Sequence, residues 1–183
     1  MKSKYAGTYF SKAREDFASD EELEVYCWLK ETESFNLVSD IEYQPEAFSL
    51  CSRASVQVKK QLKTKIKMVD KFLFHAHVYT PDFEFEAMPA IGRLFVSPLF
   101  APNKPVVIDV KGSFNPYGDP KQFSINQKWV WDKYGVYVEK IVPEKLFKKS
   151  YVPEICRLTP KRRGPVKEYI GVPVIGQFVD NLK

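Results

Sequence analysis

The chain is poor in cysteine and histidine, and it contains no long apolar run. Among its 183 residues there are two histidines and three widely spaced cysteines, Cys27, Cys51 and Cys156. No CxxC pair occurs, so we expect three reduced thiols rather than a disulfide framework or a structural zinc site. No stretch of about 20 apolar residues exists that could cross a membrane. The first residues also lack the apolar core of a signal peptide, which predicts a cytoplasmic protein.

What the chain does contain is enough apolar surface for a core. Apolar residues make up 44% and aromatic residues 15% of the sequence, which excludes global disorder. The net charge of +5 is unevenly distributed. Residues 1–120 carry 15 basic and 17 acidic side chains, whereas residues 121–183 carry 13 basic and 6 acidic ones. A basic tail of this kind is compatible with nucleic-acid binding, although many ordinary proteins share it.

The first half of the chain is predicted to be one helix followed by extended segments. Ser19 and Glu22 form a capping box, and apolar spacing then predicts a helix that fades near Glu33. Residues 41–43 are extended. Lysines alternate with apolar residues over 56–71, which predicts an amphipathic strand with one lysine face. Residues 72–86 form a strand-rich run that Pro81 interrupts, and the connection 88–104 has the composition of an insertion or a lid.

The second half predicts a strand, a helix and another strand. Residues 105–111 are β-branched and compact, residues 122–134 have helical spacing with Gly135 as the terminating residue, and residues 136–142 form a second buried-type strand. Such a unit places its two strands parallel. The overall order α, β, β, β, α, β therefore predicts an α/β protein with a mixed sheet flanked by helices. The remaining segment, 143–183, is rich in proline and is expected to be irregular.

Two acidic residues and a lysine form the main chemical pattern. Asp109 and Lys111 alternate with apolar residues, so they share one face of the predicted strand. An ion pair at the sheet edge would explain those two residues alone. Asp82 follows Pro81 on a neighbouring extended segment and adds a second carboxylate. Carboxylate and carbonyl oxygens are the ligands that hard divalent cations prefer, so the three residues together predict a metal site.

These residues resemble a known signature. Pro81-Asp82 followed by Asp109-Val110-Lys111 is similar to the motif of the PD-(D/E)XK nuclease superfamily. Longer segments resemble the phage endonuclease I type of Holliday-junction resolvase, and end-cleaving endonuclease subunits of some transposons have a similar arrangement. The segments that carry the resemblance are Ser19-Asp20-Glu21-Glu22, Tyr79-Thr80-Pro81-Asp82-Phe83 and Asp109-Val110-Lys111-Gly112.

The resemblance implies a fold and an activity. The fold would be a restriction-endonuclease-like core in residues 1–142, with insertions at 47–71 and 88–104 and a basic extension at 143–183. The activity would be Mg²⁺-dependent hydrolysis of DNA, with Mn²⁺ as a substitute. The substrate would be branched DNA in phage or mobile-element recombination or repair, and the enzyme would be a homodimer. A transposon-end or site-specific nuclease and a non-catalytic nucleic-acid-binding module are the alternatives.

The resemblance also implies roles for individual residues. Asp82, Asp109, the backbone carbonyl of Val110 and Glu22 would hold the metal, and Lys111 would lie beside the attacking water and stabilise charge. Glu22 already has a capping role, so Glu21 is the alternative helix acid.

Further residues are candidates for binding nucleic acid. The alternating lysines would line the phosphate backbone, although lysines also protect exposed strand edges from aggregation. Gln127 would orient DNA or water, unless it is an ordinary surface amide. We expect His75 and His77 to pack or to contact phosphate rather than to bind zinc, and Trp129, Trp131 and Tyr134 to be core residues. The full set of nucleic-acid-binding candidates is Lys59, Lys60, Lys63, Lys65, Lys67, Gln127, Lys161, Arg162 and Arg163.

Overall fold

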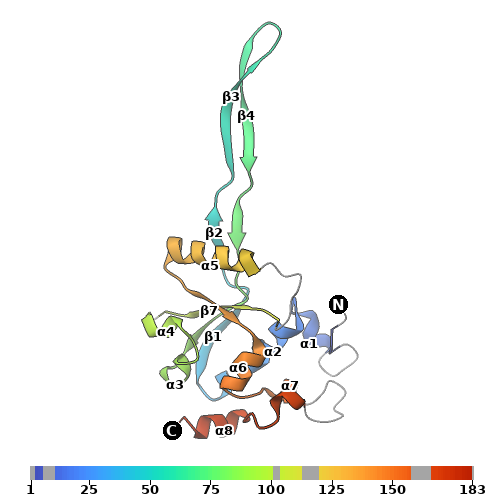
Figure 1. The fold of residues 1–183 in the computed structure, drawn as a ribbon, viewed down its shortest axis with the longest axis vertical. Coiled ribbons are helices and arrows are strands. Elements are labelled where there is room, and N and C mark those ends of the chain that lie inside the picture. The colour runs from blue at the N-terminus through green and yellow to red at the C-terminus, as the bar shows by residue number, and fades with distance from the viewer. Residues whose placement is uncertain (1–2, 6–10, 101–103, 113–119, 158–165, 183) are drawn as a thin grey trace.

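A computed structural model describes residues 3–5, 11–100, 104–112, 120–157 and 166–182 of the chain (Figure 1). The described strands are β1 Val38–Tyr43, β2 Phe48–Cys51, β3 Ala54–Gln61, β4 Ile66–Phe74, β5 His77–Tyr79, β6 Phe83–Ala87, β7 Val106–Val110 and β8 Val138–Ile141. The described helices are α1 Ser11–Glu15, α2 Asp20–Ser34, α3 Pro89–Gly92, α4 Ser97–Phe100, α5 Pro120–Tyr134, α6 Pro143–Lys149, α7 Glu154–Arg157, the 3₁₀ helix Lys167–Tyr169 and α8 Ile175–Asp180.

The centre of the molecule is a mixed four-stranded sheet in the order β1-β6-β7-β8. β1 and β6 are antiparallel, β6 and β7 are antiparallel, and β7 and β8 are parallel. α5 connects the two parallel strands, as the strand–helix–strand pattern predicts. The predicted α/β class, a mixed sheet flanked by helices, is therefore confirmed.

The two faces of the sheet belong to different apolar clusters. Val106, Ile108 and Val110 of β7 lie in the larger cluster, together with the buried side chains of α2. Val107 lies in a smaller cluster with Val130 of α5 and with residues of β2 and β5. The predicted alternation along this strand is thus correct, and it places Asp109 on the same face as Val107.

Local sequence signals explain where the two long helices begin and end. Ser19 caps α2, because its hydroxyl accepts a hydrogen bond from the Glu22 N–H at 3.1 Å. Three acids follow in the first turn, where they stabilise the positive end of the helix dipole. Gly135 ends α5 with a φ of +64°, a conformation that glycine adopts without steric cost.

The lysine-rich segment differs from its prediction. It is not one strand but an antiparallel hairpin in which β3 pairs with β4 (Figure 1). The chain reverses between Leu62 and Lys65, where the Leu62 N–H donates to the Lys65 carbonyl at 2.8 Å. Because register decides the face of each residue, the lysines do not form a single face. Lys60 lies opposite Lys67, Lys59 lies opposite Met68, and Lys63 is in the turn.

Two segments expected to be peripheral contribute to the core. The connection 88–104 forms α3 and α4, and its Ile91 and Phe95 are buried in the larger cluster, so the expectation of a lid is wrong for its described residues. Residues 143–183 are helical rather than irregular over much of their described length. They supply a set of buried side chains to the same cluster, namely Leu146, Phe147, Tyr151, Val152, Ile155, Cys156 and Phe178.

Buried hydrogen bonds connect this C-terminal region to α2. The Trp28 indole donates to the Ser150 hydroxyl at 3.1 Å, and the Tyr151 hydroxyl donates to the Trp28 carbonyl at 2.7 Å. The same tyrosine contacts the Thr32 hydroxyl.

The three cysteines are unpaired. In the described part of the chain, no helix has both the length and the apolar character needed to span a bilayer.

Replacing a core side chain from the C-terminal region tests whether that region stabilises the whole fold. Phe147→Ala removes a fully buried ring and should lower the free energy of unfolding by about 3–5 kcal/mol. Leu99→Ala is the control, because Leu99 is 74% exposed. Urea unfolding followed by tryptophan fluorescence measures both values. A Phe147→Ala cost below about 1 kcal/mol would contradict this packing.

Candidate active site

Asp82 directly precedes β6 and is held by backbone contacts with β7 and with the residue that follows β1. Its N–H donates to the Ile108 carbonyl at 3.0 Å, and its carbonyl accepts from the Gln44 N–H at 2.9 Å. Its carboxylate accepts a hydrogen bond from the Val110 N–H at 2.5 Å. The preceding Pro81 is buried. These contacts fix the side chain over the end of β7.

Asp109 lies in the middle of this arrangement and is only 4% exposed. Its carboxylate accepts a hydrogen bond from the Tyr79 hydroxyl at 2.7 Å and forms an ion pair with the Lys111 ammonium. Lys111 reaches it from two residues along the same face, as the alternation of the strand predicts. Tyr79 is not among the residues that the sequence predicts for the site. Tyr79 lies two residues after His77 in β5, so the two side chains share one face of that strand, and this spacing is the sequence signal for its position.

The two aspartates are close enough to influence each other. Burial, followed by the negative charge of Asp109, raises the pKa of the Asp82 carboxyl from its usual range to about 7. The hydrogen bond from the Val110 N–H opposes this increase, and Glu22 contributes a smaller part of it. Two carboxylates in one poorly solvated place thus repel each other when both are ionised.

The two helix acids lie in different surroundings. The Glu22 carboxylate accepts hydrogen bonds from the Ser19 hydroxyl at 2.9 Å and from the Tyr43 hydroxyl at 2.8 Å. Glu22 is therefore tied to the cap of its own helix and to β1. A Glu21 carboxylate oxygen, by contrast, lies 3.3 Å from the position that a Cβ on Gly112 would occupy. Gly112 directly follows Lys111, so Glu21 lies near the end of β7. Glu22 is close enough to Asp82 to contribute to its raised pKa.

The donor atoms suit a hard divalent cation at the aspartate pair. In the described part of the chain, no three His, Cys, Asp or Glu side chains are grouped closely enough to hold a metal ion. Asp82 and Asp109 nevertheless present two interacting carboxylates whose mutual repulsion a cation would relieve. The Val110 N–H faces Asp82, and the carbonyl of a strand residue points to the same side as its N–H. Of the four predicted ligands, Asp82, Asp109 and Val110 therefore lie together at the end of β7. The fourth, Glu22, is bound by the Ser19 and Tyr43 hydroxyls.

Other predicted residues lie elsewhere. The Gln127 amide donates to the Val138 carbonyl at 2.6 Å, which ties α5 to β8. Glu84 of β6, which is not one of the predicted site residues, lies beside Glu42 of β1, and burial together with that neighbour raises its pKa. The five candidate lysines are in the β3–β4 hairpin, away from the aspartates (Figure 1). Lys161, Arg162 and Arg163 lie outside the described residues.

The histidines make separate contacts. The His77 imidazole bonds to the Asn126 amide oxygen at 2.9 Å, and its ring lies 5.8 Å from that of Trp129. The His75 ring lies 4.6 Å from that of Phe72. These contacts agree with packing, which is one of the two roles expected for both residues, and contact with phosphate stays a prediction.

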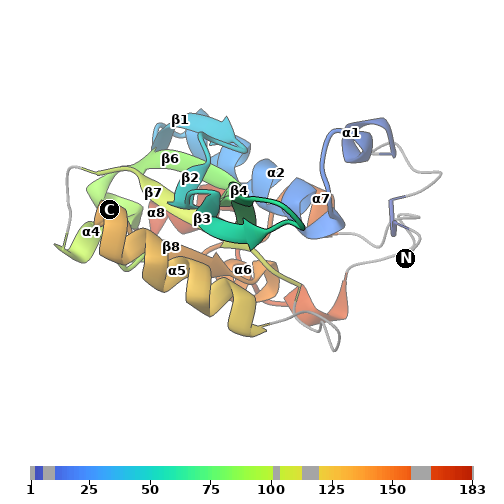
Figure 2. The same ribbon diagram turned by 90° about the horizontal axis from the view of Figure 1, so that it is seen from above.

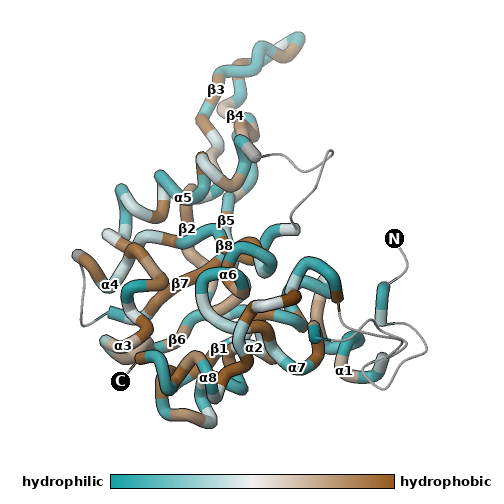
Figure 3. Tube along the Cα trace, turned by 60° about the horizontal axis from the view of Figure 1, so that its bottom comes forward, coloured by the Kyte–Doolittle hydropathy of each residue, from teal (hydrophilic) through white to brown (hydrophobic). Residues whose placement is uncertain are grey.

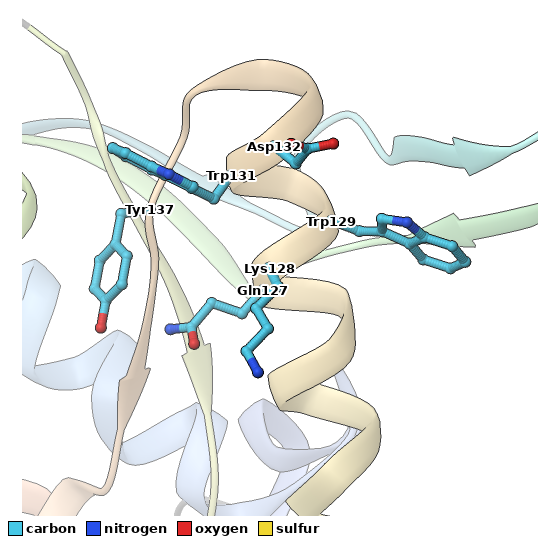
Figure 4. A pocket seen from close by; sticks show the side chains of 6 residues that line it. All are labelled: Gln127, Lys128, Trp129, Trp131, Asp132 and Tyr137. Atoms are coloured by element: carbon cyan, nitrogen blue, oxygen red, sulfur yellow. The ribbon is translucent and has the colours of Figure 1, made fainter.

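Trp129, Trp131 and Tyr134 of α5 are not core residues, so that expectation is wrong. Trp129 is 42% exposed and Trp131 is 49% exposed. Figure 4 shows the two indoles on opposite sides of α5, with Trp131 on the same side as Tyr137. Together with Gln127, Lys128 and Asp132, these three residues line an open apolar groove that lies on α5 rather than over the aspartates. Tyr134 is also partly exposed, and its hydroxyl donates to the Ser49 carbonyl at 2.8 Å.

Comparisons with protein-family models, with curated proteins and with solved structures find no match to this chain. The resemblance stated above therefore depends on the residues of the chain itself.

Removing one charge of the aspartate pair tests the repulsion between the two carboxylates. Because the pKa of Asp82 is higher in the folded protein than in the unfolded chain, the stability that its proton provides is lost as the pH rises from about 4 to 7. In metal-free buffer at pH 8, Asp82→Asn should therefore increase the free energy of unfolding by about 1–3 kcal/mol, and the gain should shrink at pH 5.

The matched control is Glu86→Gln, which makes the same chemical change at an exposed position on β6. It should leave the stability within about 0.5 kcal/mol of the original at both pH values. Urea unfolding at pH 5 and pH 8 with EDTA present provides the measurement. An Asp82→Asn protein that is less stable than the original at pH 8 would show that the two carboxylates do not repel each other.

Proposed function

We propose that this protein is a metal-dependent endonuclease that hydrolyses phosphodiester bonds in DNA. The observation that carries the proposal is the carboxylate pair of half-buried Asp82 and buried Asp109, with the Lys111 ammonium bound to Asp109. Hydrolysis of a phosphodiester needs positive charge around the phosphate and a site from which a water molecule can attack. An acidic pair beside one lysine can provide both once a divalent cation is present.

The protein's own groups would bind the metal, orient the carboxylates and stabilise charge on the phosphate. Asp82, Asp109, the Val110 carbonyl and one helix acid would hold Mg²⁺, which supplies Lewis acidity when bound. Tyr79 and the Val110 N–H orient the two carboxylates through the hydrogen bonds described above. Lys111 remains 42% exposed at its side chain, so its ammonium can reach a phosphate oxygen in solvent and stabilise the charge that develops there.

The element order supports the same proposal. The segment α2-β1-β6-β7-α5-β8 follows the order that the restriction-endonuclease-like core would have, with β2, β3, β4 and β5 inserted between its first two strands. We extend the proposal to branched DNA as the first substrate to test and to a homodimer as the active form. Two strands must be cut at a junction, and a two-fold dimer supplies two equal sites.

A cleavage assay tests the activity. The purified protein should cut a fluorescently labelled four-way DNA junction in the presence of Mg²⁺ or Mn²⁺ and should be inactive in EDTA. Asp82→Ala and Lys111→Ala should each reduce the cleavage rate by about 100-fold or more. The first removes a proposed ligand of the metal, and the second removes the ammonium that would stabilise charge on the reacting phosphate. A linear duplex of the same sequence, tested in parallel, determines whether branching matters.

Two variants control for general effects of losing a charge. Glu86→Gln changes an exposed carboxylate on β6, and Lys140→Ala removes an exposed lysine that lies opposite Asp109 on β8. Both should cleave at the original rate. Absence of cleavage with either metal on any DNA would contradict the enzymatic proposal and favour a nucleic-acid-binding module. Unreduced cleavage by Asp82→Ala and Lys111→Ala would contradict the site assignment.

A further inference from the structure

The β3–β4 hairpin, residues 54–74, is the feature that the proposed active site does not use, and we refer to it as the arm. It projects from the body of the molecule (Figure 1). In the view from above, its strands lie next to α5 (Figure 2). Every residue of β3 and β4 is exposed or half-buried. A two-stranded hairpin by itself is only marginally stable in water. Its length and exposure therefore call for a binding partner.

The charge of the arm identifies the chemistry of that partner. The arm contains six lysines and a single acid, Asp70, so its net charge of +5 equals that of the whole chain. The side chain of that acid is occupied by a contact with Gln57. Among the described ion pairs, none includes a lysine of the arm. The partner is therefore a polyanion.

The register of the arm strengthens this conclusion. Lys60 lies directly opposite Lys67, a like-charge pair that destabilises an isolated hairpin. An anion bound between two such lysines would remove the repulsion. The other face carries the exposed apolar residues Ile66, Met68 and Phe72 together with Lys59, so each face has both lysine and apolar side chains. Hydrophilic and hydrophobic residues alternate along the arm (Figure 3). Apolar side chains of this kind can lie against the methyl groups of thymine.

The dimensions of the arm select one kind of polyanion. β3 has eight residues and β4 has nine, so the ribbon is about 27 Å long at about 3.3 Å per residue. That length corresponds to about eight base pairs of B-form DNA, whose major groove, about 12 Å wide, admits a two-stranded β-ribbon. The major groove of A-form RNA is too deep and narrow for side chains to read.

The base of the arm is firmly attached to the body. β2 and β5 continue the two strands of the arm toward the sheet and pair with each other. Lys133 donates to the Ser49 carbonyl at 2.8 Å, and His77 bonds to Asn126, so α5 holds both strands. Tyr79, the last residue of β5, contacts Asp109 directly. DNA bound along the arm would thus be held in a fixed relation to the aspartates.

We infer that the arm inserts into the major groove of B-form DNA, several base pairs to one side of the bond that is cut. This inference rests on the proposed function, since it specifies the substrate of that same site as DNA with a double-stranded segment beside the cut.

Fluorescence anisotropy with a labelled 30-base-pair DNA duplex tests the inference in EDTA, where no cleavage occurs. The double variant Lys60→Ala with Lys67→Ala should bind about tenfold more weakly, and its salt dependence should be less steep by about two phosphate contacts. The matched double variant Lys145→Ala with Lys149→Ala, on exposed positions of α6, should bind as the original protein does. Far-UV circular dichroism verifies that both variants fold.

Two further measurements identify the groove and the kind of nucleic acid to which the protein binds. Methyl green, which occupies the major groove, should compete with the protein, whereas the minor-groove ligand netropsin should not. An RNA duplex of the same sequence should bind at least about tenfold more weakly than the DNA, with little effect of the arm substitutions. Competition by netropsin alone, or equal loss of DNA and RNA binding, would overturn the assignment of the groove.

The outcomes separate the inference from the proposed activity. If the arm variant binds duplex DNA as tightly as the original protein, the inference fails, whether or not Mg²⁺-dependent cleavage is observed. If the arm variant instead changes from dimer to monomer in light scattering with unaltered DNA affinity, the arm contacts a second copy of the chain. If DNA binding depends on the arm but neither the original protein nor its variants cleave DNA, the result would support the inference and contradict the proposed nuclease activity.

Discussion

The geometry of the site depends on one electrostatic constraint, which is that two carboxylates are held together at the end of an apolar strand. β7 is buried along its whole length, and Asp109 interrupts its apolar surface. Such a position is costly for a charge unless neighbouring groups compensate for it. Tyr79 and Lys111 provide that compensation directly. Asp82 adds a second negative charge, and a divalent cation bound between the two carboxylates would relieve the resulting repulsion.

Much of this arrangement could be predicted from the sequence, because it depends on local rules. The alternation of β7 fixes which residues share a face, so Asp109 and Lys111 had to be neighbours. The parallel pairing of β7 with β8 follows from the intervening helix. The cap at Ser19 likewise depends on residues within a single turn. Tyr79 was not predictable in this way, since its contact with Asp109 requires β5 to lie against the face of the sheet that carries Val107 and Asp109.

The errors have equally specific causes. The lysine alternation continues without interruption through the turn at 62–65, which contains none of the glycine, proline or asparagine residues that usually mark a reversal. A single strand and a hairpin therefore have the same pattern here. The prolines of 143–183 predict an irregular chain, yet Pro143 is the first residue of α6, a position where proline fits a helix. The tryptophans of α5 are exposed because Phe123 and Val130 already fill the space between this helix and the sheet.

The packing of the C-terminal helices also has a consequence during synthesis of the chain. α2 carries both candidate helix acids at its beginning, and its Trp28 is buried with Tyr151 and Phe178 in one cluster. That cluster cannot close on a ribosome until Phe178 has been translated and has emerged, long after both aspartates have left the exit tunnel. The acids would therefore be present in the nascent chain well before they are positioned, and the geometry around them would be completed only when the C-terminal region has packed against α2.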